Sequence, residues 1–156
     1  MIKTELSIGD WVKVPGLVYD NGLEDFDNGM CKVRRLGDGD LDVYAFEELS
    51  YSEVEPIMIT KSILERFGFV EKEAVKEVNI FEYRTDDLLA VYSMNYARVD
   101  IRYYKINESN TDENGDSNIM EFDLSANVLY VHQLQHLFRI VGKEFNEIEL
   151  IGIYEV

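Results

Sequence analysis

The alternation of hydrophobic and polar residues predicts short strands in the first part of the chain. Turn residues, including Asn28-Gly29, separate these segments. Three segments alternate in this way: DWVKV (10–14), MCKVRRL (30–36) and LDVYAF (41–46). Several short strands at this spacing are typical of a small SH3-like β-barrel. We therefore expect a barrel lobe over residues 1–58.

The segment EPIMITKSILERFGF, residues 55–69, changes to a helical period. The hydroxyl of Thr60 can cap a helix, and Ile63 and Leu64 share one helical face. Gly68 suits the left-handed residue that follows a last helical turn. The pattern predicts a short connecting helix.

Strand-like segments return after residue 77 and are followed by a longer helical pattern in VHQLQHLFRIVGKEF, residues 131–145. IELIGIYEV, residues 148–156, could add an edge strand. The strand-like segments are VNIFEYR (78–84), LLAVYSM (88–94), RVDIRYYKI (98–106) and NIMEFDL (118–124). We expect an antiparallel β-meander packed on one C-terminal amphipathic helix. The predicted fold class is therefore α+β, with a second lobe at 59–156, or one continuous compact domain.

The chain is strongly acidic, with 31 Asp and Glu against 15 Lys and Arg and a net charge of −16. This charge repels phosphate backbones and anionic membranes, so we expect neither general nucleic-acid binding nor membrane binding. No apolar run approaches the ~20 residues needed to span a bilayer, and the N-terminus lacks a signal-peptide pattern. A single cysteine, Cys31, excludes an internal disulfide. These features predict a cytoplasmic protein.

Both histidines of the chain lie in the segment 131–145. On a helical wheel the apolar residues occupy one face. The opposite face carries His132, His136, Arg139 and Lys143, which we call the helix ridge. A metal ion there would meet two cationic side chains, and Gln133 stands where a His-Glu-x-x-His motif needs Glu, so we predict no metal and no catalytic residue. The helix ridge is instead a candidate docking surface for an acidic partner or a second copy of the chain.

Two other acidic patterns resemble metal sites. Residues 110–121 follow the spacing of a calcium-binding loop, but strand-like flanks favour a hairpin loop and leave only weak calcium binding open. Asp38, Asp40 and Asp42 alternate and could share a divalent cation, although Asp in a Gly-rich turn more often faces water. We predict no cofactor from either pattern.

The segment RVDIRYYK mixes basic and aromatic residues, as single-stranded nucleic-acid sites do. Asp100, however, shares a strand face with Arg98 and Arg102. We therefore expect a solvated sheet face with ion pairs between its side chains.

Three stretches together resemble a family of uncharacterised short proteins from Bacteroides-type bacteria and their phages and prophages. These stretches are LSIGDWVKV, EPIMITKSILERFGF and LYVHQLQHLFRIVGKEFNEIEL, and the HQLQ part is the most specific. The resemblance assigns no catalytic residue, cofactor or substrate. It implies an accessory protein of a phage or mobile element that interacts with the host.

We expect a non-catalytic protein that binds another macromolecule, most readily a protein, rather than an enzyme. One alternative is an acidic DNA mimic that inhibits a host nucleic-acid-binding or defence protein. Another is a small metal-dependent hydrolase or nuclease that uses Asp38, Asp40 and Asp42. The sequence leaves the partner and the oligomeric state open.

Overall fold

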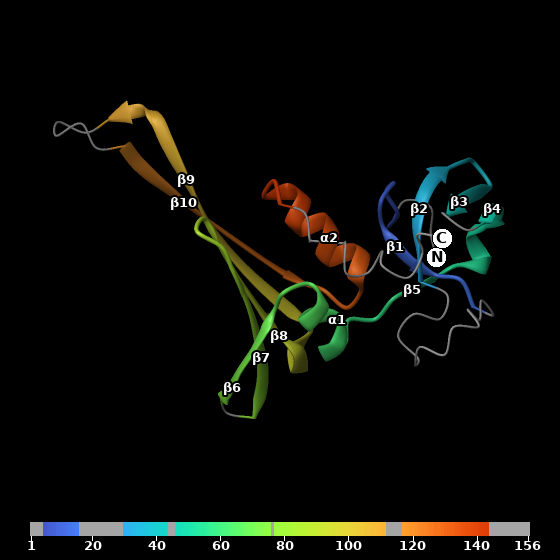
Figure 1. The fold of residues 1–156 in the computed structure, drawn as a ribbon, viewed down its shortest axis with the longest axis horizontal. Coiled ribbons are helices and arrows are strands. Elements are labelled where there is room, and N and C mark those ends of the chain that lie inside the picture. The colour runs from blue at the N-terminus through green and yellow to red at the C-terminus, as the bar shows by residue number, and fades with distance from the viewer. Residues whose placement is uncertain (1–4, 16–29, 44–45, 76, 112–116, 144–156) are drawn as a thin grey trace. The chain divides into compact units, whose positions relative to one another are not determined.

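The computed structural model describes residues 5–15, 30–43, 46–75, 77–111 and 117–143 (Figure 1). The chain divides into two compact units: unit 1 combines Met1–Ile59 with Tyr130–Val156, and unit 2 is Thr60–Leu129. The first boundary lies one residue from the boundary expected from the sequence. The C-terminal helix, however, belongs to unit 1 and not to the second lobe. The predicted edge strand at 148–156 lies outside the described residues.

Unit 1 is built on a five-stranded antiparallel sheet with the strand order β4-β3-β2-β1-β5. Its elements are β1 (Trp11–Lys13), β2 (Met30–Leu36), β3 (Asp40–Val43), β4 (Phe46–Ser50), the 3₁₀ turn η2 (Tyr51–Glu53), β5 (Glu55–Pro56) and α2 (Val131–Ile140). The apolar core contains Val12, Cys31, Val33, Leu41 and Val43. Cys31 is the small buried side chain that its place in a strand predicts, and burial raises the pKa of its thiol to about 11.

Unit 2 is an antiparallel meander with the strand order β10-β9-β8-β7-β6, which confirms the predicted meander. Its elements are α1 (Lys61–Arg66), β6 (Val70–Val75), β7 (Val78–Arg84), β8 (Leu88–Ser93), the 3₁₀ turn η3 (Met94–Tyr96), β9 (Arg98–Thr111) and β10 (Ser117–Asn127). Residues 88–93 of β8 pair with residues 98–103 of β9, so the far part of the β9–β10 hairpin extends beyond β8 (Figure 1).

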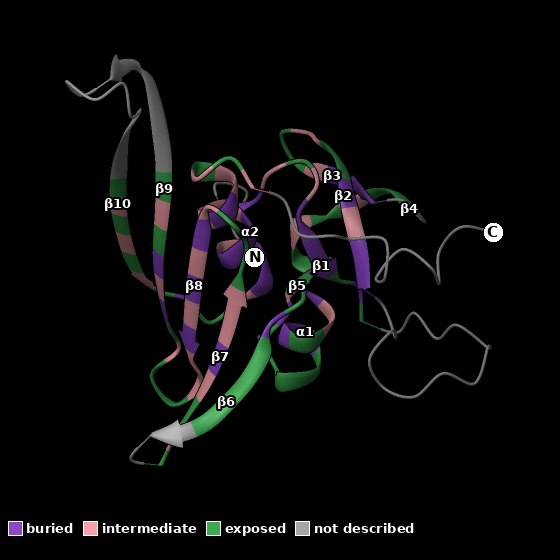
Figure 2. Ribbon diagram, turned by 60° about the vertical axis from the view of Figure 1, so that its left-hand side comes forward, coloured by how far each residue is buried: buried purple, intermediate pink, exposed green. Residues whose placement is uncertain are grey.

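The two faces of the sheet in unit 2 differ in burial, as the alternating colours of β8 show (Figure 2). Leu88, Ala90 and Tyr92 are buried, whereas Leu89 and Val91 between them are only half-buried. The register continues this division into β9, because Ala90 lies opposite Ile101 and Val91 lies opposite Asp100. We call the side of Leu89, Val91 and Asp100 the outer face and the other side the inner face.

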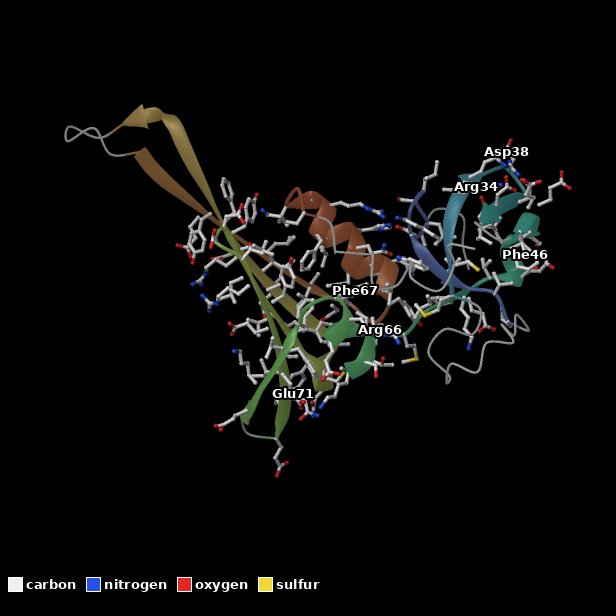
Figure 3. All side chains as sticks on the ribbon, viewed as in Figure 1. Arg34, Asp38, Phe46, Arg66, Phe67 and Glu71 are labelled. Atoms are coloured by element: carbon white, nitrogen blue, oxygen red, sulfur yellow. The ribbon has the colours of Figure 1, made fainter. Side chains whose placement is uncertain are left out.

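The connecting helix begins where its capping residue predicts. The backbone N–H of Ile63 donates to Oγ1 of Thr60 over 3.3 Å, and Gly68 adopts the positive φ of +90° expected after the last turn. Figure 3 shows Phe67 at the end of this helix, and its side chain is buried with Ile63 and Leu64. The helix is short, as predicted: it spans Lys61–Arg66, β5 takes the first two residues of the segment 55–69, and β6 begins directly after that segment.

The predicted fold class, α+β with a closed SH3-like barrel, is wrong. The described residues form two five-stranded antiparallel sheets, and the helices α1 and α2 span only 6 and 10 residues, so the fold is mostly β. In the described part of unit 1 the sheet is open, with β4 and β5 at its edges. Alternation identifies strands, but barrel closure depends on pairing between strands far apart in the sequence, which alternation does not report.

Candidate functional site

The helix ridge lies against a tight turn, residues 7–10, that precedes β1. The backbone N–H of Asp10 donates to the carbonyl of Ser7 over 3.1 Å, and the N–H of Ser7 donates back to Oδ2 of Asp10 over 2.7 Å. Gly9 between them has a φ of +91°, and a Cβ there would lie 3.2 Å from a guanidinium nitrogen of Arg139. The turn therefore holds the Asp10 carboxylate inward, where its exposed fraction is 0%.

Two ridge residues contact this buried carboxylate. Nε2 of His136 lies 2.8 Å from Oδ2 of Asp10, and Nη1 of Arg139 donates to Oδ1 over 2.7 Å. The side chains of His136 and Arg139 are 34% and 31% exposed. A buried carboxylate is tolerated only when charged or hydrogen-bonding partners satisfy it, so this arrangement ties α2 to the start of β1.

Gln135, one helical position before His136, ties the same two elements together through backbone groups. Its Oε1 accepts from the N–H of Trp11 over 3.0 Å, and its Nε2 donates to the carbonyl of Gly9 over 3.2 Å. Gln135 is buried. The polar side of α2 thus binds backbone groups of residues 9–11 as well as the carboxylate of Asp10.

His132 is the most buried member of the helix ridge, with 3% of its surface exposed. Its ring stacks on Tyr130 at a centroid distance of 5.9 Å, and its Nδ1 has no hydrogen-bond partner among the described residues. Burial lowers the pKa of His132 from its ordinary value, which favours the neutral imidazole in the folded chain.

The expectation that the helix ridge is an exposed cationic surface is wrong for His132 and incomplete for the other residues. His136 and Arg139 bind Asp10, and Lys143 is half-buried. The helical wheel failed because it equates a polar face with a solvent-facing one, whereas a polar face can be buried against a distant carboxylate. A role of the helix ridge in docking a partner stays a prediction.

The alternating carboxylates of residues 38–42 form an arginine-centred cluster. Arg35 donates from Nε to Oδ2 of Asp42 over 2.6 Å and from Nη2 to Oδ1 over 2.9 Å, and the same Nη2 lies 3.3 Å from Oδ1 of Asp40. The hydrogen bonds from Arg35 and from the N–H of Glu48 lower the pKa of Asp42 to about 2. Figure 3 shows Asp38 at the β2–β3 turn. Two of the three proposed cation ligands are therefore bound to arginine.

The calcium-like segment 110–121 lies within the β9–β10 hairpin, with β9 on one side and β10 on the other, as the strand-like flanks predicted. Residues 112–116 lie outside the described part of the chain. Among the residues that are described, no group of three or more His, Cys, Asp or Glu side chains is placed to hold a metal ion.

The outer face of unit 2 contains an open groove of about 400 Å³. Apolar Leu89 and Val91 of β8 line one part of it. Apolar Ile101 of β9 also lines the groove. The other lining residues are polar and come from β9 and β10: Asp100, Arg102, Asp123 and Ser125. The groove therefore combines an apolar strip with a charged strip across three adjacent strands, which is a common composition for a recognition surface.

Ion pairs fix the charged strip, as the sequence predicted. Arg98 binds Asp100 at 3.0 Å, and Arg102 lies 2.8 Å from Oε1 of Glu121 and 3.0 Å from Oδ1 of Asp123. The hydrogen bond from Arg98 lowers the pKa of Asp100, so its carboxylate stays ionised. The charges across the groove are ordered before any partner arrives, which reduces the entropy cost of binding.

Leu89 and Val91 were not predicted as candidate site residues. A signal was present, because LLAVYS places apolar residues on both faces of β8 although the neighbouring strands put charged residues on the outer face. Asp10 was not predicted either, because its only local sign is the position of an acidic residue at the start of a buried strand.

Comparison with known proteins gives no match to a family model, a curated protein or a solved structure. The resemblance to short phage and Bacteroides-type proteins therefore stays a prediction. Within the described ranges, neither α1 nor α2 is long and apolar enough to cross a membrane.

Proposed function

We propose that this chain is a non-catalytic binding protein that recognises another protein through the outer face of unit 2. The groove lined by Leu89 and Val91 carries this proposal, because it exposes an apolar strip beside ordered charges. The resemblance to phage proteins supports an accessory role in a bacterial cytoplasm. The helix ridge is the weaker candidate, since two of its side chains already bind Asp10.

The test is quantitative capture of host proteins by three forms of the chain. Val91→Lys places a charge in the apolar strip, whereas Ser93→Lys places the same charge two residues further along the same strand face and outside the groove lining. We expect the parent and Ser93→Lys to retain the same partner and Val91→Lys to lose it.

Other results would favour the alternatives. Capture of a DNA-binding protein by all three forms, lost in high salt, would support the acidic mimic. Hydrolysis of a nucleic acid or ester by the purified chain upon addition of Mg²⁺ or Mn²⁺ would support the hydrolase. A specific partner that all three forms capture equally well at high salt would contradict recognition through the groove.

A further inference from the structure

The strand β10, which lines one side of the groove, forms an edge of the sheet in unit 2. It is 11 residues long and pairs with β9 alone among the described residues. In an antiparallel strand, alternate residues direct their N–H and C=O groups to the neighbour and the residues between them direct theirs away. About half of the residues of β10 therefore present backbone hydrogen-bonding groups to the open side of the sheet.

The other sheet edges are shorter or irregular. On β6, at the opposite edge of unit 2, the register shifts between Lys72 and Val75. Glu71 of this strand, labelled in Figure 3, forms an ion pair with Lys61. In unit 1, β5 has only two residues, and β4 contains Glu48 with a φ of +55°. By contrast, β10 keeps a regular register from Asn118 to Asn127. It is the edge on which another strand can pair over several residues.

The side chains of β10 define what such a strand must carry. On the outer face, Glu121 and Asp123 are exposed, and a strand paired beside them brings its own side chains within about 5 Å of theirs. On the inner face, Phe122 and Leu124 are only half-buried, so an added strand gains apolar contact there. A matching strand therefore alternates basic residues with apolar ones.

The local charge also argues against a second copy of this chain. Arg102 lies against both Glu121 and Asp123, so one cation faces two carboxylates and the edge keeps a negative charge. An antiparallel pair of two β10 strands would bring these carboxylates against their counterparts, and directly opposed like charges destabilise strand pairs. The net charge of −16 instead attracts a cationic segment.

We propose that the β10 edge binds an extended segment of a partner protein in which Lys or Arg alternates with apolar residues, by adding that segment to the sheet as a sixth strand. This inference rests on the proposed function, because the added strand borders the groove. Backbone hydrogen bonds supply the affinity of such an arrangement, and the alternation of side chains supplies its specificity.

The probe is a nine-residue peptide, Lys-Val-Lys-Ile-Lys-Val-Lys-Ile-Lys with blocked ends, and its binding is measured by calorimetry. A second peptide has the same composition with all lysines grouped at one end. Two further peptides carry N-methyl groups on the odd or on the even residues, so that each blocks the donors of one peptide edge. We expect the alternating peptide to bind, the grouped peptide to bind at least roughly tenfold more weakly, and only one of the two methylated peptides to retain binding.

Charge reversal in the protein locates the site. Glu121→Lys is expected to weaken binding of the alternating peptide by roughly tenfold or more. Glu73→Lys makes the same change at an exposed position of β6, at the opposite edge, and should have a small effect on this binding. Equal binding of both methylated peptides, or equal weakening by both variants, would reduce the interaction to general charge attraction and overturn the inference. Sedimentation of the free chain as a dimer that Glu121→Lys changes would assign the edge to a second copy.

The two proposals fail separately. If Val91→Lys abolishes capture of a host partner but the methylated peptides show no edge preference, recognition through the groove holds and strand addition does not. If the peptide shows the edge preference while capture is insensitive to Val91→Lys, β10 is a peptide site and the proposed groove function is wrong.

Discussion

Unit 1 and unit 2 use acidic side chains in opposite surroundings. In unit 1 the Asp10 carboxylate is fully buried and held by His136, Arg139 and the backbone of Ser7. In unit 2, Asp100 and Asp123 lie on the outer face, where their side chains are 47% and 67% exposed and their cationic partners face solvent as well. A buried ion pair cannot be separated without a large loss of stability, whereas an exposed pair contributes little to stability and stays accessible to a partner. Burial thus distinguishes structural charge from charge available for recognition.

The largest expected effect is the loss of the buried carboxylate. Asp10→Ala leaves His136 and Arg139 beside an apolar methyl group, and removing one member of a buried pair typically costs roughly 3–5 kcal/mol in the free energy of unfolding. Trp11, the one tryptophan of the chain, is 2% exposed, so its fluorescence during urea unfolding reports on unit 1 directly.

Removing both charges sharpens this prediction. The double variant Asp10→Ala/Arg139→Met is expected to be more stable than Asp10→Ala alone, because it leaves no guanidinium beside the missing carboxylate. A loss below about 1 kcal/mol for Asp10→Ala would mean that the pair is effectively solvated, and the contrast between the two units would disappear.

The next effect concerns the backbone contacts of Gln135. Gln135→Ala removes its hydrogen bonds to the N–H of Trp11 and to the carbonyl of Gly9, and each buried polar group left without a partner costs roughly 1–3 kcal/mol. Gln133→Ala is the matched control, because Gln133 lies on the same helix but is half-buried, and its Oε1 accepts from the N–H of Tyr130 at the start of α2. Thermal unfolding of the two variants should show the larger decrease in Tm for Gln135→Ala.

A smaller effect is a dependence of stability on pH that originates in unit 1. Because burial lowers the pKa of His132 from its ordinary value of 6.5, the unfolded chain takes up a proton at this residue before the folded chain does. The contribution of His132 is therefore fully present above about pH 6.5 and is lost as the pH falls toward the lower folded pKa. Asp10 and Glu5 act on the pKa in the opposite direction, and His136 acts in the same direction as burial.

The variant His132→Leu isolates this contribution. Urea unfolding at several pH values between 5 and 8 should show a shallower decline toward low pH for His132→Leu than for the parent. Identical slopes for the two proteins would mean that His132 titrates alike in the folded and unfolded chains.

The smallest expected effect belongs to unit 2. Asp100→Asn removes the charge from the pair with Arg98 on the outer face, and exposed pairs contribute about 0–1 kcal/mol. The unfolding free energy should therefore change by no more than about 1 kcal/mol, measured in urea by far-ultraviolet circular dichroism. A loss of unfolding free energy comparable to that of Asp10→Ala would mean that the ion pairs of the outer face stabilise the fold as the buried pair does.

Local features of the fold were predictable because they depend on neighbouring residues. The predicted segments MCKVRRL and VNIFEYR coincide with β2 and β7, and Thr60 caps α1 as its hydroxyl and position require. In each case the signal, whether alternation or a capping residue, lies within a few positions of the element it specifies.

Features that depend on distant residues were not predictable. Asp10 and Arg139 are 129 positions apart, and nothing near either residue indicates that they form a pair. The groove has the same origin, since Val91, Asp100 and Ser125 meet only through the pairing of three strands. The open form of the sheet in unit 1 likewise depends on which strands pair at its edges.

Hydrogen–deuterium exchange of the chain, with and without the alternating lysine peptide, tests most directly whether the β10 edge of unit 2 binds the peptide while the helix ridge has a structural role. We expect slower exchange for the amides of β10, with the amides of α2 unchanged. Protection centred on residues 131–140 of α2, with β10 unaffected, would contradict binding at β10 and identify the helix ridge as the binding surface.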